Sequence, residues 1–314
     1  MLNDYYQNIG LKGFLQRYGI MNALRRGLFM ANPFHQVEDY EVRKVLWQSK
    51  AARKIRPYLK YKENDVNDME FHAENVNDPI WIFWDAGLES APELVKSCVA
   101  SVIHYANREV IILTNKNLDD YIRLPDYIEK KKDAGQIPMA GYADLMRFAL
   151  LEHYGGTWID ATVYLTDRIP ERILNSDFFA FRNSLLLIEN PVLYPAWFLH
   201  AKKGNKTIRE VRNVAFAYWL DNRHVVEYLL PNLIITLLLK EDVAAEKKIP
   251  YLNSDYSEYL MKVLPETYTE GKFEWIRKLT CIHKLSYKLD VAIDKENSIY
   301  HYLFANGGVK RTDI

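Results

Sequence analysis

Residues 139–166 read MAGYADLMRFALLEHYGGTWIDATVYLT, and this stretch decides the fold class. Its first part is apolar on nearly every side, which predicts a buried helix from Met139 to Tyr154. Gly155 and Gly156 follow, and glycine is common just past the end of a helix because it tolerates a left-handed backbone. The run from Thr157 to Leu165 then predicts a buried strand. A helix that leads directly into a buried strand is typical of α/β proteins.

Two apolar runs upstream predict neighbouring strands. Residues 79–84 read PIWIFW and residues 109–114 read EVIILT, and short continuous apolar runs are typical of buried strands. The segment 90–105 between them predicts a helix that begins at Ser90, a residue type that caps helix N-termini. Strand, helix and strand in this order predict a parallel pair with a right-handed crossover. The pattern as a whole predicts an α/β fold with an open, mostly parallel sheet, in which ligands bind beyond the carboxyl ends of the strands.

Composition divides the chain into three segments. Residues 1–62 predict helices and carry twelve Lys or Arg against four Asp or Glu, so their net charge is +8. Because the whole chain has a net charge of zero, residues 63–314 carry a net charge of −8. Residues 63–78 are polar, which predicts a linker. Residues 79–314 predict the main domain, which includes strands near 178–181 and 185–188 and a helical insertion at about 195–243.

Bulk properties exclude several classes of protein. A net charge of zero provides no overall field for nucleic acid, so we expect no nucleic-acid partner. The two cysteines, Cys98 and Cys281, provide no disulfide framework and no cysteine-based metal site. The longest apolar stretch, residues 228–239, is shorter than the ~20 residues of a spanning helix, and the first residues lack the pattern of a secretory signal. These patterns predict a cytoplasmic protein.

Two charged side chains lie inside the apolar helix predicted at 139–154. Asp144 and Arg147 are three residues apart and therefore lie on one helix face. A buried charge is costly unless it is paired or used. One interpretation is a structural ion pair. The other is a ligand site, in which the carboxylate binds sugar or ribose hydroxyls and the guanidinium binds phosphate.

Asp160 is the only charged residue in the strand predicted at 157–165. Side chains alternate along a strand, so Asp160 should share a face with Trp158, Thr162 and Tyr164. A catalytic or ligand-binding site is one context that tolerates a carboxylate at this depth, and a cap or turn contact is another. The residues alone leave both interpretations open.

Five strings of this chain resemble glycosyltransferase family 32. They are IWIFWDAG at 80–87, LPDY at 124–127, YADLMR at 142–147, YGGTWIDAT at 154–162 and, more weakly, HKLSYK at 283–288. The resemblance is strongest to the capsular-polysaccharide-synthesis branch and more distant to the clostridial toxins that transfer sugars. It implies a GT-A fold and transfer of a sugar from a nucleoside diphosphate with retention of the anomeric configuration. It covers residues 79–166 well and says little about residues 1–62.

The same resemblance implies roles for individual residues. Asp144, Arg147 and Asp160 would form the catalytic set. In that set Asp144 would hold donor hydroxyls, Arg147 the donor sugar or diphosphate, and Asp160 would match the first aspartate of an Asp-x-Asp motif. The residues implied for donor binding are Phe83, Trp84, Thr114, Asn115, Trp158, Thr162, Lys284 and Lys288. The chemistry agrees, because aromatic rings stack on nucleobases and a planar guanidinium suits phosphate.

The second aspartate of the Asp-x-Asp motif is absent, because Thr162 stands at its position. A hydroxyl is a poorer ligand for Mn²⁺ or Mg²⁺ than a carboxylate. Metal use therefore stays open. Either Asp160 binds the ion together with another group, for which His283 is the candidate, or Lys and Arg replace the ion. The alternative explanation of His283 is a core or solvated histidine.

These features predict an enzyme. The expected activity is that of a retaining hexosyltransferase, which moves a sugar from a nucleotide-sugar donor, first of all a UDP-sugar, to a glycan or lipid-linked oligosaccharide of a bacterial surface polysaccharide. Two alternatives stay open. Thr162 also fits a non-catalytic homologue that binds sugar nucleotides, and Asp144 with Asp160 would fit a carboxylate hydrolase.

Residues 1–35 add a prediction about location. Basic and apolar residues recur there at helical spacing: Lys12, Arg17, Arg25 and Arg26 with Leu11, Phe14, Leu15, Tyr18 and Leu28. An amphipathic helix of this kind either lies on an anionic membrane or packs on the acidic remainder of the protein. The first interpretation would place the protein on the inner face of the plasma membrane, close to lipid-linked acceptors.

Overall fold

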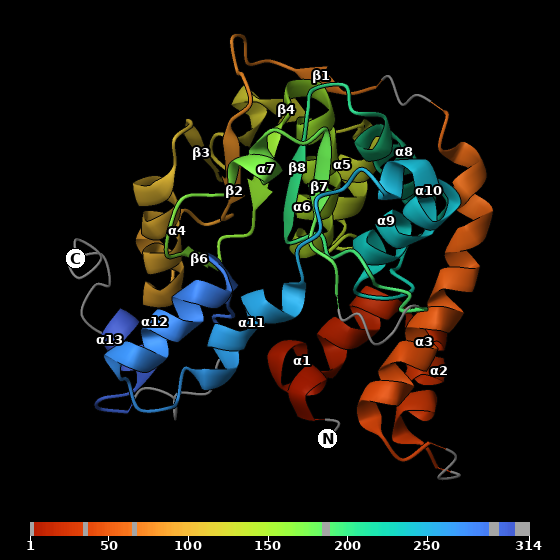
Figure 1. The fold of residues 1–314 in the computed structure, drawn as a ribbon. Coiled ribbons are helices and arrows are strands. Elements are labelled where there is room, and N and C mark those ends of the chain that lie inside the picture. Colours follow the sequence, from red (N-terminus) through yellow and green to blue (C-terminus); the bar gives the residue numbers. More distant parts are fainter. Residues whose placement is uncertain (1–2, 34–36, 65–67, 184–188, 289–294, 305–314) are drawn as a thin grey trace.

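The computed structural model describes residues 3–33, 37–64, 68–183, 189–288 and 295–304, and side chains from residue 10 onward. Its centre is a five-stranded sheet of β3 (Val110–Leu113), β2 (Ile80–Phe83), β5 (Gly156–Ile159), β8 (Phe198–Ala201) and β7 (Phe178–Ala180), in that order. Strand β2 pairs in parallel with β3 and β5, whereas β8 runs antiparallel to β5 and β7. The α/β prediction is confirmed, and the sheet is mixed (Figure 1).

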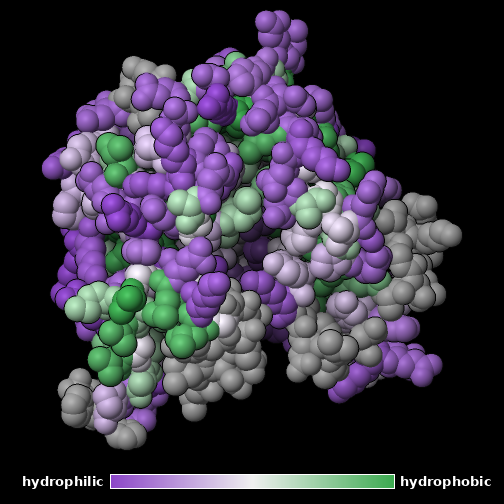
Figure 2. Space-filling view, turned by 180° about the vertical axis from the view of Figure 1, so that it is seen from behind, coloured by the Kyte–Doolittle hydropathy of each residue, from purple (hydrophilic) through white to green (hydrophobic). Residues whose placement is uncertain are grey.

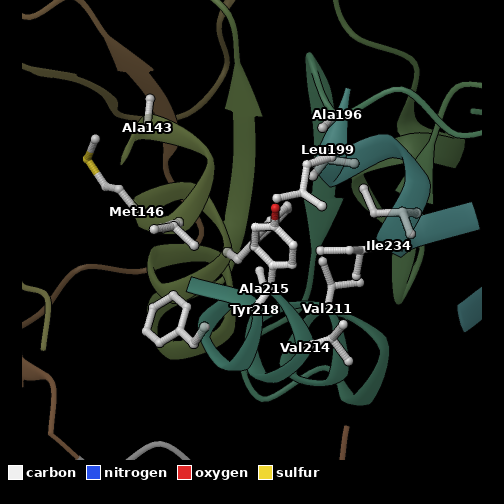
Figure 3. Packing of buried hydrophobic residues seen from close by; sticks show 14 of the residues in the cluster. Ala143, Met146, Ala196, Leu199, Val211, Val214, Ala215, Tyr218 and Ile234 are labelled. Atoms are coloured by element: carbon white, nitrogen blue, oxygen red, sulfur yellow. The ribbon is translucent and has the colours of Figure 1, made fainter. Parts of the chain in front are cut away.

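Helices cover both faces of this sheet. On one face, α6 (Met139–Tyr154), α8 (Lys206–Asp221) and α9 (Leu230–Glu241) pack on Trp81 and Trp158. Figure 3 shows buried side chains of α6, β8, α8 and α9 gathered in this core. On the other face, α4 (Glu93–Tyr105) packs on the isoleucines of β2 and β5. Because β2 and β5 are buried on both faces, their sequences are apolar without alternation, as predicted.

The remaining elements complete the periphery. A third apolar cluster joins α11 (Ser254–Val263), α12 (Glu270–Leu279) and α13 (Ile299–Phe304) to a two-stranded sheet of β6 (Val163–Leu165) and β9 (Ile282–Lys284). A second small sheet pairs β1 (Glu70–Phe71) with β4 (Ile122–Arg123). The shorter helices are η1 (Arg56–Tyr61), η2 (Leu88–Ser90), η3 (Leu118–Asp120), α5 (Asp126–Asp133), α7 (Glu171–Leu174) and α10 (Val243–Glu246).

The junction between α6 and β5 requires glycine. Gly155 ends the helix with φ of 75°, and its N–H donates a hydrogen bond of 3.0 Å to the carbonyl of Leu151. Gly156 has φ of 104°, and a Cβ atom there would collide with the carbonyl oxygen of Pro79. This close approach sets β5 beside β2 and thereby places Asp160 at the carboxyl end of the sheet.

The single strand predicted from Thr157 to Leu165 is wrong, because the chain turns after Ile159. The Asp160 N–H donates 2.9 Å to the carbonyl of Trp197, and the Val163 N–H donates 2.9 Å to the carbonyl of Asp160. These bonds end β5 and start β6, which belongs to a different sheet. Trp158 and Tyr164 therefore lie in separate apolar clusters and do not share one face.

Three smaller expectations also change, and a fourth is not tested. Helix α4 begins at Glu93 after Pro92, while Ser90 belongs to η2, so Ser90 is not the N-cap. The stretch at 195–243 is not a purely helical insertion, because it begins with β8 of the central sheet. The strand expected at 185–188 lies outside the described residues. The polar segment at 63–78 contains the short strand β1.

Residues 1–62 contain α1 (Asn3–Tyr18), α2 (Ile20–Ala31) and α3 (Tyr40–Ile55), followed by η1. Phe14 and Tyr18 of α1 and Ile55 of α3 are buried in the same core cluster as α6 and α8. These helices therefore pack on the α/β body, and Phe14 and Tyr18 cannot insert into a membrane. This corrects the apolar set predicted for lipid contact.

Candidate active site

A cavity of about 770 Å³ opens beyond the carboxyl ends of β2 and β5. This is where ligands bind in open α/β sheets, and the volume suits a ligand of nucleotide-sugar size. The wall combines segments that are far apart in sequence. They are Arg17 of α1; Phe83, Trp84 and Asp85 at the end of β2; Ala143, Asp144 and Arg147 of α6; Trp158, Asp160 and Thr162 at the end of β5; Tyr228 before α9; Glu258 and Met261 of α11; and residues 284–288 at the end of β9.

Three charged side chains from α6 and the end of β5 meet at the cavity wall. Arg147 Nη2 lies 3.2 Å from Asp144 Oδ1 and 3.2 Å from Asp160 Oδ1. The Arg147 guanidinium also donates to the carbonyl of Ala196 and lies 4.9 Å from the centre of the Trp158 ring. The Trp158 indole N–H donates 3.1 Å to Asp160 Oδ1. Arg147 is thus held by contacts on several sides. Asp144, Arg147 and Asp160 form an ion-pair network that is also part of the cavity wall.

Lys284 approaches Asp160 from the opposite side. The antiparallel register of β6 and β9 pairs Lys284 with Val163 and so brings it next to the turn after β5. Its Nζ atom lies 2.6 Å from Thr162 Oγ1 and 3.5 Å from Asp160 Oδ2. Asp160 therefore holds a cation at each carboxylate oxygen. Two fixed positive groups flank one carboxylate at the cavity wall, and a diphosphate requires positive groups of this kind.

Burial raises the pKa of Asp144 to about 7, with Asp160 adding to the rise and Arg147 opposing it. The Asp144 side chain keeps 19% of its surface accessible, through the cavity that it lines. A carboxyl group with this pKa is partly protonated near neutral pH. It can therefore accept hydrogen bonds when ionised and donate one when protonated.

This pKa predicts a pH-dependent contribution to stability. Because the folded value lies above the ordinary value of 3.8, the folded protein keeps a proton that the unfolded chain releases. The free energy of unfolding should fall as the pH rises from about 4 to 7, by roughly 4 kcal/mol at most from this group. In urea titrations, Asp144→Asn should gain stability relative to wild type across that window and gain no more above it. Asp177→Asn removes an exposed carboxylate and serves as the control. If the free energy of unfolding changed with pH in the same way for wild type and both variants, the assigned pKa of Asp144 would be contradicted.

Aromatic side chains form another part of the wall. Phe83 and Trp84 line the cavity, and the Trp84 ring meets the Tyr287 ring edge-on at 5.3 Å. The Lys288 Nζ atom lies 5.7 Å from the centre of the Tyr287 ring. Phe83, Trp84 and Lys288, which were predicted for donor binding, thus reach the cavity. A wall of rings beside basic groups can hold a base next to its phosphates.

Thr114 and Asn115 do not line the cavity. The Thr114 N–H and hydroxyl both donate to Asn117 Oδ1, at 2.7 and 3.1 Å, and this closes the turn after β3. The Asn115 N–H donates 3.0 Å to the carbonyl of Asp85. In this structure Thr114 shapes the turn after β3 and Asn115 supports the loop after β2, and their predicted donor contact stays a prediction.

His283 is not brought to the cavity. Neighbouring residues of a strand point to opposite sides, so Lys284 faces the cavity while His283 is fully buried, with Nε2 3.2 Å from Thr166 Oγ1. Burial lowers the pKa of His283 to about 3, so the ring is neutral. His283 therefore has the environment of a core histidine and lies away from the cavity in which a metal ion would meet Asp160.

The side chains around Asp160 fit a metal ion poorly. Both oxygens of Asp160 already face cations, from Arg147 and from Lys284. Within the described residues, no group of three His, Cys, Asp or Glu side chains could hold a metal ion. Arg147 and Lys284 occupy the positions at which an ion would meet Asp160.

Sequence reasoning missed three charged or polar residues of the wall. The Arg17 guanidinium lies 5.1 Å from the centre of the Tyr228 ring, and both residues line the cavity. Glu258 accepts 3.2 Å from the Ser254 hydroxyl, and burial raises its pKa. These residues come from α1, the approach to α9 and α11, and no local motif marked them.

The fold and cavity define an α/β protein with a cavity lined by charged side chains at the carboxyl ends of β2 and β5. The chain belongs to the capsular polysaccharide synthesis protein family, whose sequence model matches residues 32–303. The resemblance to the capsular-polysaccharide-synthesis branch, first noted in the strings between residues 80 and 162, is thereby confirmed.

Two further proteins are similar to parts of this chain. The protein named Probable glycosyltransferase FCK3, from Fusarium pseudograminearum (strain CS3096), is 31% identical over an alignment of 162 residues. The alignment covers 46% of this chain and 40% of that protein. The chain thus spans less than half the length of this relative. A solved structure titled PaToxG Glycosyltransferase matches with a TM-score of 0.38 and 15% identity, over 76% of this chain and 95% of that chain. A likeness this low carries no argument about function.

Proposed function

We propose that this chain is a retaining glycosyltransferase with a GT-A-like core. It transfers a sugar from a nucleoside diphosphate sugar, with UDP-sugars as the first candidates, to a glycan or lipid-linked oligosaccharide in surface polysaccharide synthesis at the inner face of the membrane. The observation that carries the proposal is the placement of Arg147 and Lys284 around Asp160 in a cavity of about 770 Å³. Family membership and the similarity to a protein named as a glycosyltransferase support it.

Each part of the wall has a role in this proposal. Arg147 and Lys284 bind the diphosphate, and Asp160 holds these two cations in place. Asp144 binds hydroxyl groups of the donor sugar or ribose, because its carboxyl group reaches the same cavity. The aromatic wall of Phe83, Trp84 and Tyr287 borders the base.

The proposed step is a front-face substitution. The bond between the anomeric carbon and the phosphate oxygen breaks, and the acceptor oxygen bonds to the same face of that carbon. The acceptor proton passes to the departing phosphate oxygen, so no enzyme nucleophile is needed. Charge develops on the diphosphate in the transition state, and Arg147 and Lys284 stabilise it because they are already fixed in place.

We further propose that these two cations act as the counter-charges of the diphosphate in place of a metal ion. The proposal rests on the two oxygens of Asp160, each of which faces a cation. A guanidinium and an ammonium group each supply a positive charge without an added ion.

Donor binding is the first experimental test. Thermal unfolding is followed with UDP, GDP, UDP-glucose, UDP-N-acetylglucosamine and GDP-mannose, each with Mg²⁺, with Mn²⁺ and with EDTA. A ligand that binds only the folded protein adds about 2.7 kcal/mol to the free energy of unfolding when its concentration is 100 times its dissociation constant. The midpoint temperature of unfolding should therefore rise by several degrees. We expect at least one nucleoside diphosphate to give this rise, and the rise should persist in EDTA. AMP is the control, because it lacks a diphosphate.

The outcome separates the remaining classes. A midpoint that no nucleotide raises would contradict the proposed function. A nucleotide that raises the midpoint without sugar release or transfer would favour a non-catalytic homologue that binds sugar nucleotides. Thr162, at the position of the second aspartate, is the residue that suggested this alternative. Cleavage of simple glycosides or esters without any effect of nucleotides would favour a hydrolase that uses Asp144 and Asp160.

A further inference from the structure

We propose that the exposed face of α1 and α2 is a surface that binds an anionic membrane. Five large apolar side chains of these two helices are between 55% and 69% exposed: Leu11 of α1 and Ile20, Met21, Leu24 and Leu28 of α2. We call them the apolar face. Figure 2 shows a group of hydrophobic residues at its lower left, on an otherwise largely hydrophilic side of the molecule. Because this view is seen from behind, the same part of the molecule, with α2 and α3, lies at the lower right in Figure 1.

The apolar face is separate from the face that packs on the body. At 100° per residue, Ile20, Met21, Leu24 and Leu28 fall within about 100° of arc on α2. The buried residues Ala23, Arg26 and Met30 fall on the opposite side of the helix. Helix α2 thus has one apolar side covered by the protein and a second one open to solvent.

The helix pair is held rigidly to the body. Phe14 and Tyr18 are buried in the main core, and Arg26 forms a buried ion pair with Glu227, with the Nε and Oε2 atoms 3.5 Å apart. The Asn22 side chain donates to the carbonyls of Val225 and Val226. The apolar face is therefore a fixed part of the folded protein.

The charges around the apolar face favour an anionic lipid surface as the occupant. No Asp or Glu occurs between residues 5 and 37, although four Lys or Arg do. Arg17 and Arg26 point toward the body, at Tyr228 and Glu227, whereas Lys12 and Arg25 are exposed beside the apolar face. A basic helix with an open apolar stripe lies in the plane of a membrane interface, and each basic residue near an anionic leaflet strengthens binding about fivefold.

Attachment at this face would also orient the cavity. Arg17, in the last turn of α1, lines the cavity, so the helix pair that contacts lipid also forms part of the wall. None of the helices in the described part of the chain has the length and apolar character that crossing a membrane requires, and surface attachment needs neither. If the proposed function holds, this arrangement brings the cavity close to a lipid-linked acceptor. The lipid contact itself does not depend on that function.

The experiment is co-sedimentation of the full chain with vesicles of phosphatidylcholine alone and with phosphatidylglycerol added. We expect wild type to bind the anionic vesicles at least tenfold more tightly than the neutral ones, and to bind more weakly in high salt. Met21→Ser with Leu24→Ser should weaken binding tenfold or more by removing apolar contact. Lys12→Glu with Arg25→Glu should abolish the preference for anionic vesicles.

Matched controls keep the result specific. Ile103→Ser on α4 and Leu220→Ser on α8 remove exposed apolar side chains elsewhere, and Lys116→Glu with Lys247→Glu reverses exposed charges elsewhere. All of them should bind like wild type. Absence of binding, equal binding to both vesicle types, or equal loss in the controls would overturn the proposal. So would a dimer in light scattering that Met21→Ser with Leu24→Ser dissociates, because the apolar face would then bind a second copy. Donor binding measured on the same preparations tests the proposed function separately.

Discussion

Replacing Asp160 by asparagine is expected to lower the rate of sugar transfer about 100-fold or more while the protein stays folded. The carboxylate separates two cations, with Oδ1 3.2 Å from Arg147 Nη2 and Oδ2 3.5 Å from Lys284 Nζ. Asparagine keeps one acceptor oxygen but turns an NH₂ group toward one of the cations, so that two donors face each other. The cations would then lose the alignment that the diphosphate requires.

The measurement is the steady-state rate with a donor that the wild-type protein uses, together with the unfolding midpoint of each variant. Asp177→Asn is the matched control, since Asp177 is an exposed carboxylate that pairs with Lys202 at 2.7 Å. It should keep the full rate. A folded Asp160→Asn protein that transfers sugar within a few-fold of wild type would remove Asp160 from the proposed site.

Replacing Lys284 by methionine is expected to have the second largest effect, a fall in kcat/KM of roughly 100-fold. Methionine has a similar length but no charge, so the diphosphate would lose one of its two counter-charges. The Lys284 Nζ atom also contacts Thr162 Oγ1 at 2.6 Å, and that hydroxyl would lose its partner. The loss should appear mainly in kcat, because the charge on the diphosphate grows as the sugar departs.

Two variants show whether the charge itself matters. Lys284→Arg should recover at least a tenth of the wild-type kcat/KM, because it restores a cation next to Asp160. Lys202→Met removes a lysine that forms an exposed ion pair, and it should leave the rate unchanged. Equal losses for methionine and arginine at position 284 would point to packing and contradict the role of counter-charge.

The sequence predicted the elements whose signals are local. Helix α6 keeps its predicted bounds, and β2 and β3 lie within the predicted apolar runs. The break after Ile159 escaped prediction because the turn depends on a hydrogen bond from Asp160 to Trp197, which lies on a distant segment. Strand β8 escaped because a short apolar run such as FLHA does not distinguish strand from helix.

In the candidate site, too, local signals could be predicted from the sequence and contacts between distant segments could not. The predicted helix placed Asp144 and Arg147 on one face, the family resemblance grouped Asp160 with them, and the structure brings all three together. Arg17, Tyr228 and Glu258 reach the cavity only through packing between helices far apart in the chain. The opposite directions of His283 and Lys284 could be known only once the pairing of β9 with β6 was fixed.

The central claim is that this cavity holds a nucleoside diphosphate sugar and cleaves its anomeric bond. NMR of the anomeric proton and the phosphorus signals tests it most directly. UDP-glucose, UDP-galactose, UDP-N-acetylglucosamine and GDP-mannose are each incubated with octyl glycosides and with wild type or Asp160→Asn. We predict that wild type consumes at least one donor, releases the nucleoside diphosphate and forms a product with the anomeric configuration of the donor, while Asp160→Asn leaves the donor intact. Donors that stay intact with wild type, or that both proteins consume equally fast, would contradict the account.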